Sequence, residues 1–248
     1  FMFAHGLECT RSLYIDSLSL IMALIIGIVG TGICVYSIGY MHDFYFGIHH
    51  PETEMPDRRP TFFALMFVFL SAMYGIIFFN NMIWLFTAWE VTTLCSFLLI
   101  GFTKTDEAIH NAFRQIIMNL VGGIAFLAAL FYLAIQFSCI DFMDFIVFGT
   151  IAPTYVVLPL TCLSLAGITK AAQMPFHTWL LGAMVAPTPT SALLHSSTMV
   201  KAGVFMLIKC APIYAVSFAP SILVILVGGI TFLLCSMMAI SQSNGKRV

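Results

Sequence analysis

The chain has 248 residues, of which 60% are hydrophobic and only 8% are charged. A soluble globular domain carries about 25% charged residues, so this composition excludes an ordinary water-soluble fold and indicates a membrane protein. The formal net charge of −1 gives no electrostatic basis for binding nucleic acid.

Neither a metal nor a redox cofactor is indicated by the residues that usually bind one. The seven cysteines include no C-x-x-C pair, so neither a zinc ribbon nor an iron–sulfur site is predicted. The histidines of the polar loop 42–59 are interpreted as part of a wet interfacial loop. We therefore expect no cofactor in this chain and leave open whether it belongs to an enzyme.

Apolar stretches long enough to cross a bilayer, about 20 residues each, recur along the sequence. They indicate one transmembrane domain covering residues 1–248, with an all-α membrane fold of about seven helices. The expected spans are 17–41, 60–79, 82–101, 108–137, 153–184, 191–209 and 218–240.

The fifth of these stretches, 153–184, is too long for a simple crossing and contains Pro175. Proline has no backbone N–H and its ring clashes with the carbonyl one turn earlier, here that of Ala171. The sequence therefore predicts two half-helices that meet near 171–174. Lys170 would end the first of them, where freed carbonyls and the helix dipole favour a cation.

Four ionisable residues on three different spans lie at membrane depth: Glu90, Lys170, His195 and Lys201. Such groups are expensive to bury and usually functional. A Glu–Lys pair that forms and breaks changes the proton affinity of the lysine by a few kcal/mol, and moving one charge across 100 mV costs about 2.3 kcal/mol. Because histidine exchanges protons near neutral pH, these residues predict a proton path. A packing role for Glu90 and a core role for His195 stay open.

Three further residues are possible supports for this path. Pro175 would interrupt the helix next to Lys170. Arg114 is expected to face a partner or to extend toward the membrane interface. His177 fits a satisfied core position equally well. Lys209 lies near a helix end and is expected to extend into water.

Basic residues in the connecting segments predict the orientation. Counting seven crossings, Arg58, Arg59, Lys104, Lys246 and Arg247 lie on one side, and Arg11 and Lys209 on the other. By the positive-inside rule the 42–59 loop is cytoplasmic and residue 1 lies on the outer side of the plasma (inner) membrane.

The chemistry-bearing motifs resemble a known family, the antiporter-like proton-pumping subunits shared by respiratory complex I, Mrp-type cation/proton antiporters and membrane-bound [NiFe] hydrogenases. The motifs are Trp89-Glu90; Lys170-Ala171 with Pro175-Phe176 and Trp179-Leu180; Pro187-Thr188-Pro189 with Ser191-Ala192-Leu193 and His195; and Lys201-Ala202-Gly203-Val204. The resemblance implies an inverted-repeat fold in which Glu90 and Lys170 form the coupling ion pair. His195 and Lys201 would be the lateral relay.

Within the family, the sequences of segments 89–102, 112–123 and 179–205 are most similar to the large antiporter-like subunit of energy-converting hydrogenases and formate hydrogenlyase-type complexes. Complex I relatives usually carry Pro-Asp after the Trp-Leu pair and often Thr at the position of Lys201, whereas this chain has Leu181-Gly182 and Lys201. They also commonly have an Asp after the glycine of the fourth span, where this chain has Gly122-Gly123. Family members are longer, so a fragment of a longer polypeptide is expected.

The resemblance implies a proton-translocating subunit of a redox-driven complex, such as an energy-converting hydrogenase or an NADH dehydrogenase-like assembly. Its partners would be other membrane and peripheral subunits, which would carry the redox chemistry. A stand-alone multisubunit cation/proton antiporter and a truncated membrane anchor are the alternatives. The site offers few hard oxygen ligands beyond Glu90 and hydroxyl groups, which favours H⁺ over Na⁺.

Overall fold

The computed structural model describes residues 7–10, 12–46 and 57–242. Apart from one two-stranded antiparallel hairpin, its regular elements are helical. In chain order they are β1 (Leu7–Thr10), β2 (Leu13–Ile15), α1 (Ser17–Phe46), α2 (Arg59–Phe78), α3 (Met82–Ile100), η1 (Gly101–Thr103), α4 (Asp106–Phe137), α5 (Phe142–Ile151), α6 (Pro153–Lys170), α7 (Thr178–Gly182), η2 (Ala183–Val185), α8 (Thr188–Ala192), η3 (Leu193–Ser197), α9 (Met199–Lys209), α10 (Ala211–Tyr214) and α11 (Phe218–Ile240).

Six helical segments among the described residues are long and apolar enough to cross a membrane. They are Ser17–Phe46, Arg59–Phe78, Met82–Thr103, Asp106–Phe137, Thr188–Lys209 and Phe218–Ile240. The expected all-α membrane fold is therefore confirmed. The remaining expected span corresponds to α6 and α7, which are separate helices.

Local sequence signals begin several of these helices. Pro60 occupies the first turn of α2, where its missing N–H has no helical partner to lose. The side chain of Asn81 accepts hydrogen bonds from the amides of Ile83 and Trp84 at the start of α3. Thr105 caps α4 by accepting from the amide of Ala108. Helix α1 runs to Phe46, five residues into the loop predicted at 42–59; residues 47–56 of that loop lie outside the described residues.

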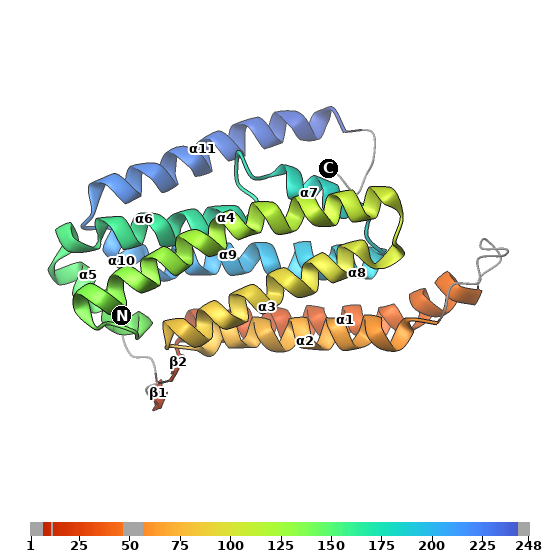
Figure 1. Cartoon of the computed structure of the whole chain (residues 1–248), viewed down its shortest axis with the longest axis horizontal. Coiled ribbons are helices and arrows are strands. Elements are labelled where there is room, and N and C mark those ends of the chain that lie inside the picture. The colour runs from red at the N-terminus through yellow and green to blue at the C-terminus, as the bar shows by residue number, and fades with distance from the viewer. Residues whose placement is uncertain (1–6, 11, 47–56, 243–248) are drawn as a thin grey trace.

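The long helices lie side by side along the longest axis of the molecule (Figure 1). Helices α1 and α2 form one edge, α11 forms the opposite edge, and α4, α6 and α9 lie between them. Helix α6 packs against α4, α9 and α11. Helix α6, which ends at the first interruption, is thus enclosed by three neighbouring helices.

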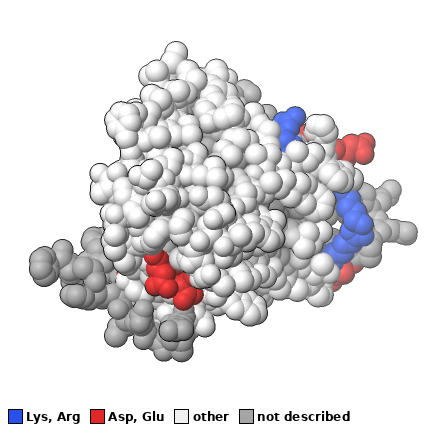
Figure 2. All heavy atoms as spheres, turned by 60° about the vertical axis from the view of Figure 1, so that its left-hand side comes forward, with Lys and Arg blue, Asp and Glu red and all other residues white. Residues whose placement is uncertain are grey.

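The surface matches a lipid environment. Figure 2 shows a broad face of the molecule without charged side chains, and the Lys, Arg, Asp and Glu that are visible lie toward its margins. Many large apolar side chains on the outer faces are exposed, among them Ile28, Ile135 and Phe232 at 72%, 74% and 78%. Apolar exposure on this scale is unfavourable in water and neutral in lipid.

Two of the crossing segments are interrupted, whereas the sequence predicts one interruption. Helix α6 ends at Lys170 and α7 begins at Thr178, on either side of Pro175. The second interruption is a correction to the continuous helix expected over 191–209: α8 gives way to a π-helical turn, η3, before α9 begins. Thr198 leaves helical geometry there (φ −131°, ψ −89°), and its hydroxyl donates to the carbonyl of Leu193. Hydroxyl side chains that compete for backbone carbonyls in this way often bend helices.

Candidate ion path around two interrupted helices

Lys170 is the most deeply buried charged side chain among the described residues, with 0% exposure. It is the last residue of α6, and its Nζ reaches across to α3. There it donates to the Trp89 carbonyl at 2.8 Å and to Thr93 Oγ1 at 2.8 Å. The same Nζ lies 4.8 Å from the centroid of the Trp89 ring. The ammonium group therefore has neutral acceptors in a site without water-exposed surface.

Glu90 lies on the same part of α3, directly after Trp89, and does not form an ion pair with Lys170 in this structure. Its Oε1 is buried and has no hydrogen-bond partner among the described residues. The carboxyl group instead faces Gly123 of α4, where a Cβ would come within 2.5 Å of Oε1. In this structure the two residues of the implied coupling pair therefore contact different groups: Lys170 contacts α3, and Glu90 contacts Gly123 of α4.

The first interruption is held by specific contacts around Pro175. After Lys170 the chain turns through Ala172, whose φ of 52° lies in the left-handed region that non-glycine residues rarely adopt. The amide of Met174 donates to Thr231 Oγ1 of α11 at 2.9 Å. Trp179 Nε1 donates to the carbonyl of Thr169 at 3.0 Å, so one of the carbonyls at the end of α6 is satisfied from α7.

The second interruption lies against the first. A Cβ on Gly203 of α9 would overlap the Gly167 carbonyl and come within 2.6 Å of the Ala171 amide, so α6 and α9 are in backbone contact there. His195 lies in the π-helical turn, with its ring centroid 6.5 Å from that of Trp179. Both of its ring nitrogens are buried and without a hydrogen-bond partner among the described residues.

The other candidate residues lie at different distances from this centre. Lys201 lies in the first turn of α9 beyond His195 and is partly buried. His177 lies directly before α7 and lines a cavity of about 160 Å³. Cys235 of α11 and Gln242, just after that helix, line the same cavity. Arg114 is exposed on the outer face of α4, so the structure does not bring it to Lys170.

Several buried polar residues of α3 and α4 were not among the residues predicted for the ion path. They are Thr93 and Ser96 on α3 and Gln115 and Asn119 on α4, none more than 3% exposed. Thr93 contacts Lys170 directly, and Gln115 Nε2 donates to Ser96 Oγ at 2.8 Å. The spacing of Gln115 and Asn119, one helical turn apart, predicts that they share a face of the helix, but it does not show that this face is buried.

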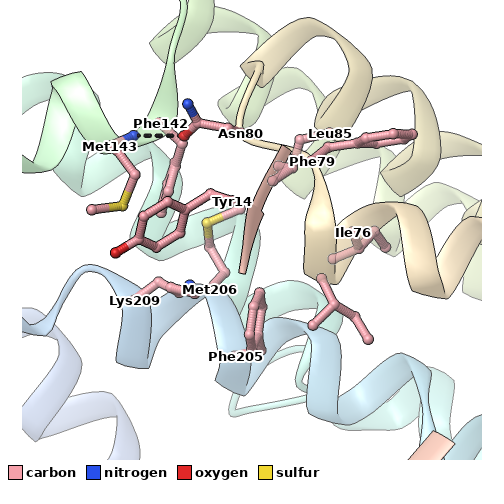
Figure 3. A pocket seen from close by; sticks show the side chains of 11 residues that line it. Tyr14, Ile76, Phe79, Asn80, Leu85, Phe142, Met143, Phe205, Met206 and Lys209 are labelled. Carbon is pink, nitrogen blue, oxygen red and sulfur yellow. Dashed lines mark hydrogen bonds between the residues drawn. The ribbon is translucent and has the colours of Figure 1, made fainter. Parts of the chain in front are cut away.

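A buried ion pair lies at the C-terminal end of α9 and corrects the expectation that Lys209 extends into water. Lys209 Nζ lies 2.6 Å from Asp16 Oδ2, and the two side chains are only 9% and 11% exposed. Lys209 and Tyr14 border the same small pocket (Figure 3), with Nζ 5.1 Å from the Tyr14 ring centroid. Burial raises the pKa of Asp16, but the hydrogen bonds and charge of Lys209 and the Ser19 amide outweigh it and hold this pKa below 3.8.

The arrangement defines a class: a multi-pass membrane protein with interrupted helices and buried ionisable groups at the interruptions, as ion-translocating proteins have. Comparison with known proteins is more specific. Residues 79–248 match the family model of the membrane region of NADH:quinone oxidoreductase and Mrp antiporters, and residues 1–45 match that of the N-terminus of complex I chain 5. The chain belongs to this family of antiporter-like membrane subunits.

Individual relatives agree with the family. The chain is 34% identical over 239 residues to Na(+)/H(+) antiporter subunit A1 of Staphylococcus aureus strains JH9 and Newman, covering 95% of this chain and 28% of theirs. It superposes on a chain of the Mrp complex of Dietzia sp. DQ12-45-1b with a TM-score of 0.83 and 27% identity, covering 98% of this chain and 26% of that one. The chain thus spans about a quarter of the length of these relatives.

Proposed function

We propose that this chain carries protons across the plasma membrane as part of a multisubunit cation/proton antiporter, together with further membrane subunits. Glu90, Lys170, His195 and Lys201 are the residues through which the protons pass. The observation that carries the proposal is Lys170: it is fully buried, it is bonded to neutral acceptors, and Glu90 has an oxygen without a hydrogen-bond partner among the described residues. The 34% identity to an antiporter subunit supports antiport as the setting.

The proposed mechanism uses two positions of the lysine. In the first, Nζ donates to the Trp89 carbonyl and Thr93, as in this structure. In the second, it pairs with the free carboxylate oxygen of Glu90. A buried ion pair favours the charged lysine by several kcal/mol relative to neutral acceptors, so moving between the positions changes its hold on a proton. This change is of the same order as the roughly 2.3 kcal/mol that one charge requires per 100 mV.

The path onward would cross the contact between the two interruptions. His195 lies next to Trp179, which is itself bonded to the end of α6, and its two ring nitrogens are free to accept and donate. Neutral imidazole passes a proton by accepting at one nitrogen and releasing at the other. Lys201 would receive the proton on α9. By the positive-inside count, we propose that the 42–59 loop lies on the cytoplasmic side of this path.

A redox-driven complex is the second candidate, favoured by the similarity of the Glu90, Lys170 and Lys201 motifs to hydrogenase-type subunits. The two differ in what drives the flux. In inverted vesicles that contain the full complex, an antiporter moves protons when Na⁺ is added to a vesicle with a pH gradient and no electron donor. A redox pump moves protons only when the electron donor is supplied.

Replacement of Lys170 by Ala tests the proposal itself. At matched assembly we expect proton flux to fall to background, because the substitution removes the amine that takes up and releases the proton in the proposed path. Lys104→Ala, in the exposed turn after η1, is the matched control and should leave the flux unchanged. Native flux with Lys170→Ala would show that the buried lysine is structural and the chain an anchor.

A further inference from the structure

A cavity of about 350 Å³ lies beside the Asp16–Lys209 ion pair. Its walls come from segments far apart in the sequence: β2 and the start of α1, the short helix α5, and the junction of α9 with α10. Tyr14, Met143 and Lys209, which Figure 3 shows around the neighbouring small pocket, line this cavity as well. Its volume is within the range of small-molecule sites, about 300–1,000 Å³, so it can hold a ligand of that size.

The position of the cavity relative to the membrane follows from the helices around it. The membrane-length segment Ser17–Phe46 begins at the cavity, and Thr188–Lys209 ends there. Helix α5 is apolar but has only 10 residues, too few to cross a bilayer. Ile208, on the cavity wall, is 48% exposed on the apolar outer surface. The cavity therefore lies at the depth where lipid headgroups meet their acyl chains.

The lining has an apolar part and a charged part, as a lipid has. The apolar residues that line it are Leu18, Met143, Ile146, Ile208, Ala211 and Pro212. The charged ones are Asp16 and Lys209. Acyl chains are already in an apolar surrounding in the bilayer, so apolar walls alone favour no particular lipid. The selectivity of such a site comes from its charged groups.

Both charged groups can form further hydrogen bonds. Lys209 Nζ has three N–H groups, and Asp16 Oδ2, at 2.6 Å, is the one acceptor that the described residues give it. Asp16 Oδ1 accepts from the Ser19 amide at 2.8 Å, and a carboxylate has room for about four hydrogen bonds in total. The two charges cancel, so a ligand with one anionic and one cationic group gives each of them a counter-charge. A purely anionic ligand would meet the Asp16 carboxylate.

We propose that this cavity binds a phospholipid whose headgroup contains a phosphate and a primary ammonium, the phosphoethanolamine type. The phosphate accepts from Lys209, the ammonium donates to Asp16, and the first part of an acyl chain lies against Ile146 and Ile208. A quaternary ammonium has no N–H for the carboxylate, and a glycerol headgroup has no positive charge. Phosphocholine and phosphoglycerol lipids therefore bind more weakly. The site is independent of the proposed proton path.

Photo-crosslinking in the full complex tests the site. A phosphatidylethanolamine with a diazirine near the start of one acyl chain is added in trace amounts to nanodiscs of phosphatidylcholine, and the crosslinked peptides are mapped after irradiation. We expect crosslinks to α5 and to the α9–α10 junction. Excess unlabelled phosphatidylethanolamine should reduce them about tenfold, and equal amounts of phosphatidylglycerol should not. Crosslinks spread evenly over the outer surface, or equal competition by both lipids, would overturn the proposal.

A substitution in the apolar wall tests the cavity itself. Ile208→Trp places a larger side chain in the wall, and we expect the crosslinks at α5 and the α9–α10 junction to fall about tenfold. Val147→Trp is the matched control, because Val147 is 54% exposed on α5 and is not among the residues that line the cavity. Equal crosslinking in native protein and Ile208→Trp would show that the lipid does not lie in the cavity.

A double variant tests the headgroup. Asp16→Asn with Lys209→Gln keeps two hydrogen-bonding side chains and leaves no charge without its partner. We expect the preference for phosphatidylethanolamine over phosphatidylglycerol to fall about tenfold, the equivalent of one charge-assisted hydrogen bond. A preference that survives in this variant would overturn the assignment of the headgroup to the ion pair.

Discussion

At Gly123 the absence of a side chain decides where a carboxyl group lies. A Cβ at this position would come within 2.5 Å of Glu90 Oε1 and 3.2 Å of its Cδ, well inside van der Waals contact. Gly122 has the same role for Thr169, since a Cβ there would overlap the threonine side chain. The two glycines thus allow α4 to approach Glu90 on α3 and Thr169, the residue directly before Lys170 on α6.

Gly123→Ala is therefore expected to displace Glu90 and to lower proton flux several-fold while the chain still assembles. Gly228→Ala and Gly229→Ala are matched controls, because a Cβ at either position has no atom within 4 Å. Each control adds about 1 kcal/mol of helix propensity and should leave transport unaffected. Flux would be measured in vesicles at equal amounts of complex. Native flux with Gly123→Ala would mean that the position of Glu90 in this structure is not the one that matters.

The residues of the candidate path divide into those with a sequence signal and those without one. Glu90 and Lys170 were identified because a charge in an apolar helix is rare enough to be informative. Thr93 was missed because a threonine in a membrane helix is common and its contact with Lys170 joins positions 77 residues apart. Nor does the sequence reveal that Lys170 bonds neutral groups of α3 instead of Glu90, since this depends on side-chain position and not on residue type.

At the scale of elements, the sequence predicts a helix interruption where a proline lies within it and does not predict one where no proline is present. The break after α6 follows from Pro175, which removes a backbone donor. The π-helical turn at Leu193–Ser197 has no proline, and the two that precede it, Pro187 and Pro189, begin a helix. The hydroxyl of Thr198 donates to the Leu193 carbonyl there, which is one of several local bonds that a Ser/Thr-rich segment can form.

The ends of α1 and α9 are joined by the pair Asp16–Lys209, and this contact should respond to acid. The pKa of Asp16 is held below its ordinary value of 3.8, so its contribution to stability is complete above about pH 4 and is lost as the pH falls through the lower, folded-state pKa. We expect Asp16→Asn to lower the thermal unfolding midpoint at neutral pH, since Lys209 would be left buried without its counter-charge. The free-energy cost is about 1–3 kcal/mol.

The difference between native protein and Asp16→Asn should shrink as the pH is lowered, which a pH series of melting curves on the detergent-solubilised complex would measure. Asp57→Asn is the control, because Asp57 pairs with Arg59 at an exposed position and such pairs contribute little. A difference that stayed constant down to acid pH would mean that Asp16 acts through shape and not through its charge.

At the scale of the whole molecule, the membrane-length helices differ in how much of their surface the rest of the protein buries. In α3 half of the membrane-length window is buried, whereas in α11 none of it is. Within α11 only Pro220 is buried. The hydrogen bond from the Met174 amide to Thr231 Oγ1 is one of few polar contacts between α11 and the other described residues. Helix α11 therefore depends on an apolar surrounding for its stability more than any other segment that the structure describes.

A charge in the middle of α11 tests this dependence. Phe232 is 78% exposed near the centre of the helix, and Phe232→Arg should reduce membrane integration, because an arginine at the centre of a bilayer helix costs about 2.5–3.5 kcal/mol. Ile240→Arg is the matched control: Ile240 is 88% exposed but ends the helix, where a long side chain reaches the interface. The fraction of chain that resists alkaline extraction measures integration. Equal extraction of the two variants would mean that water or a polar surface, and not an apolar one, lies against the centre of α11.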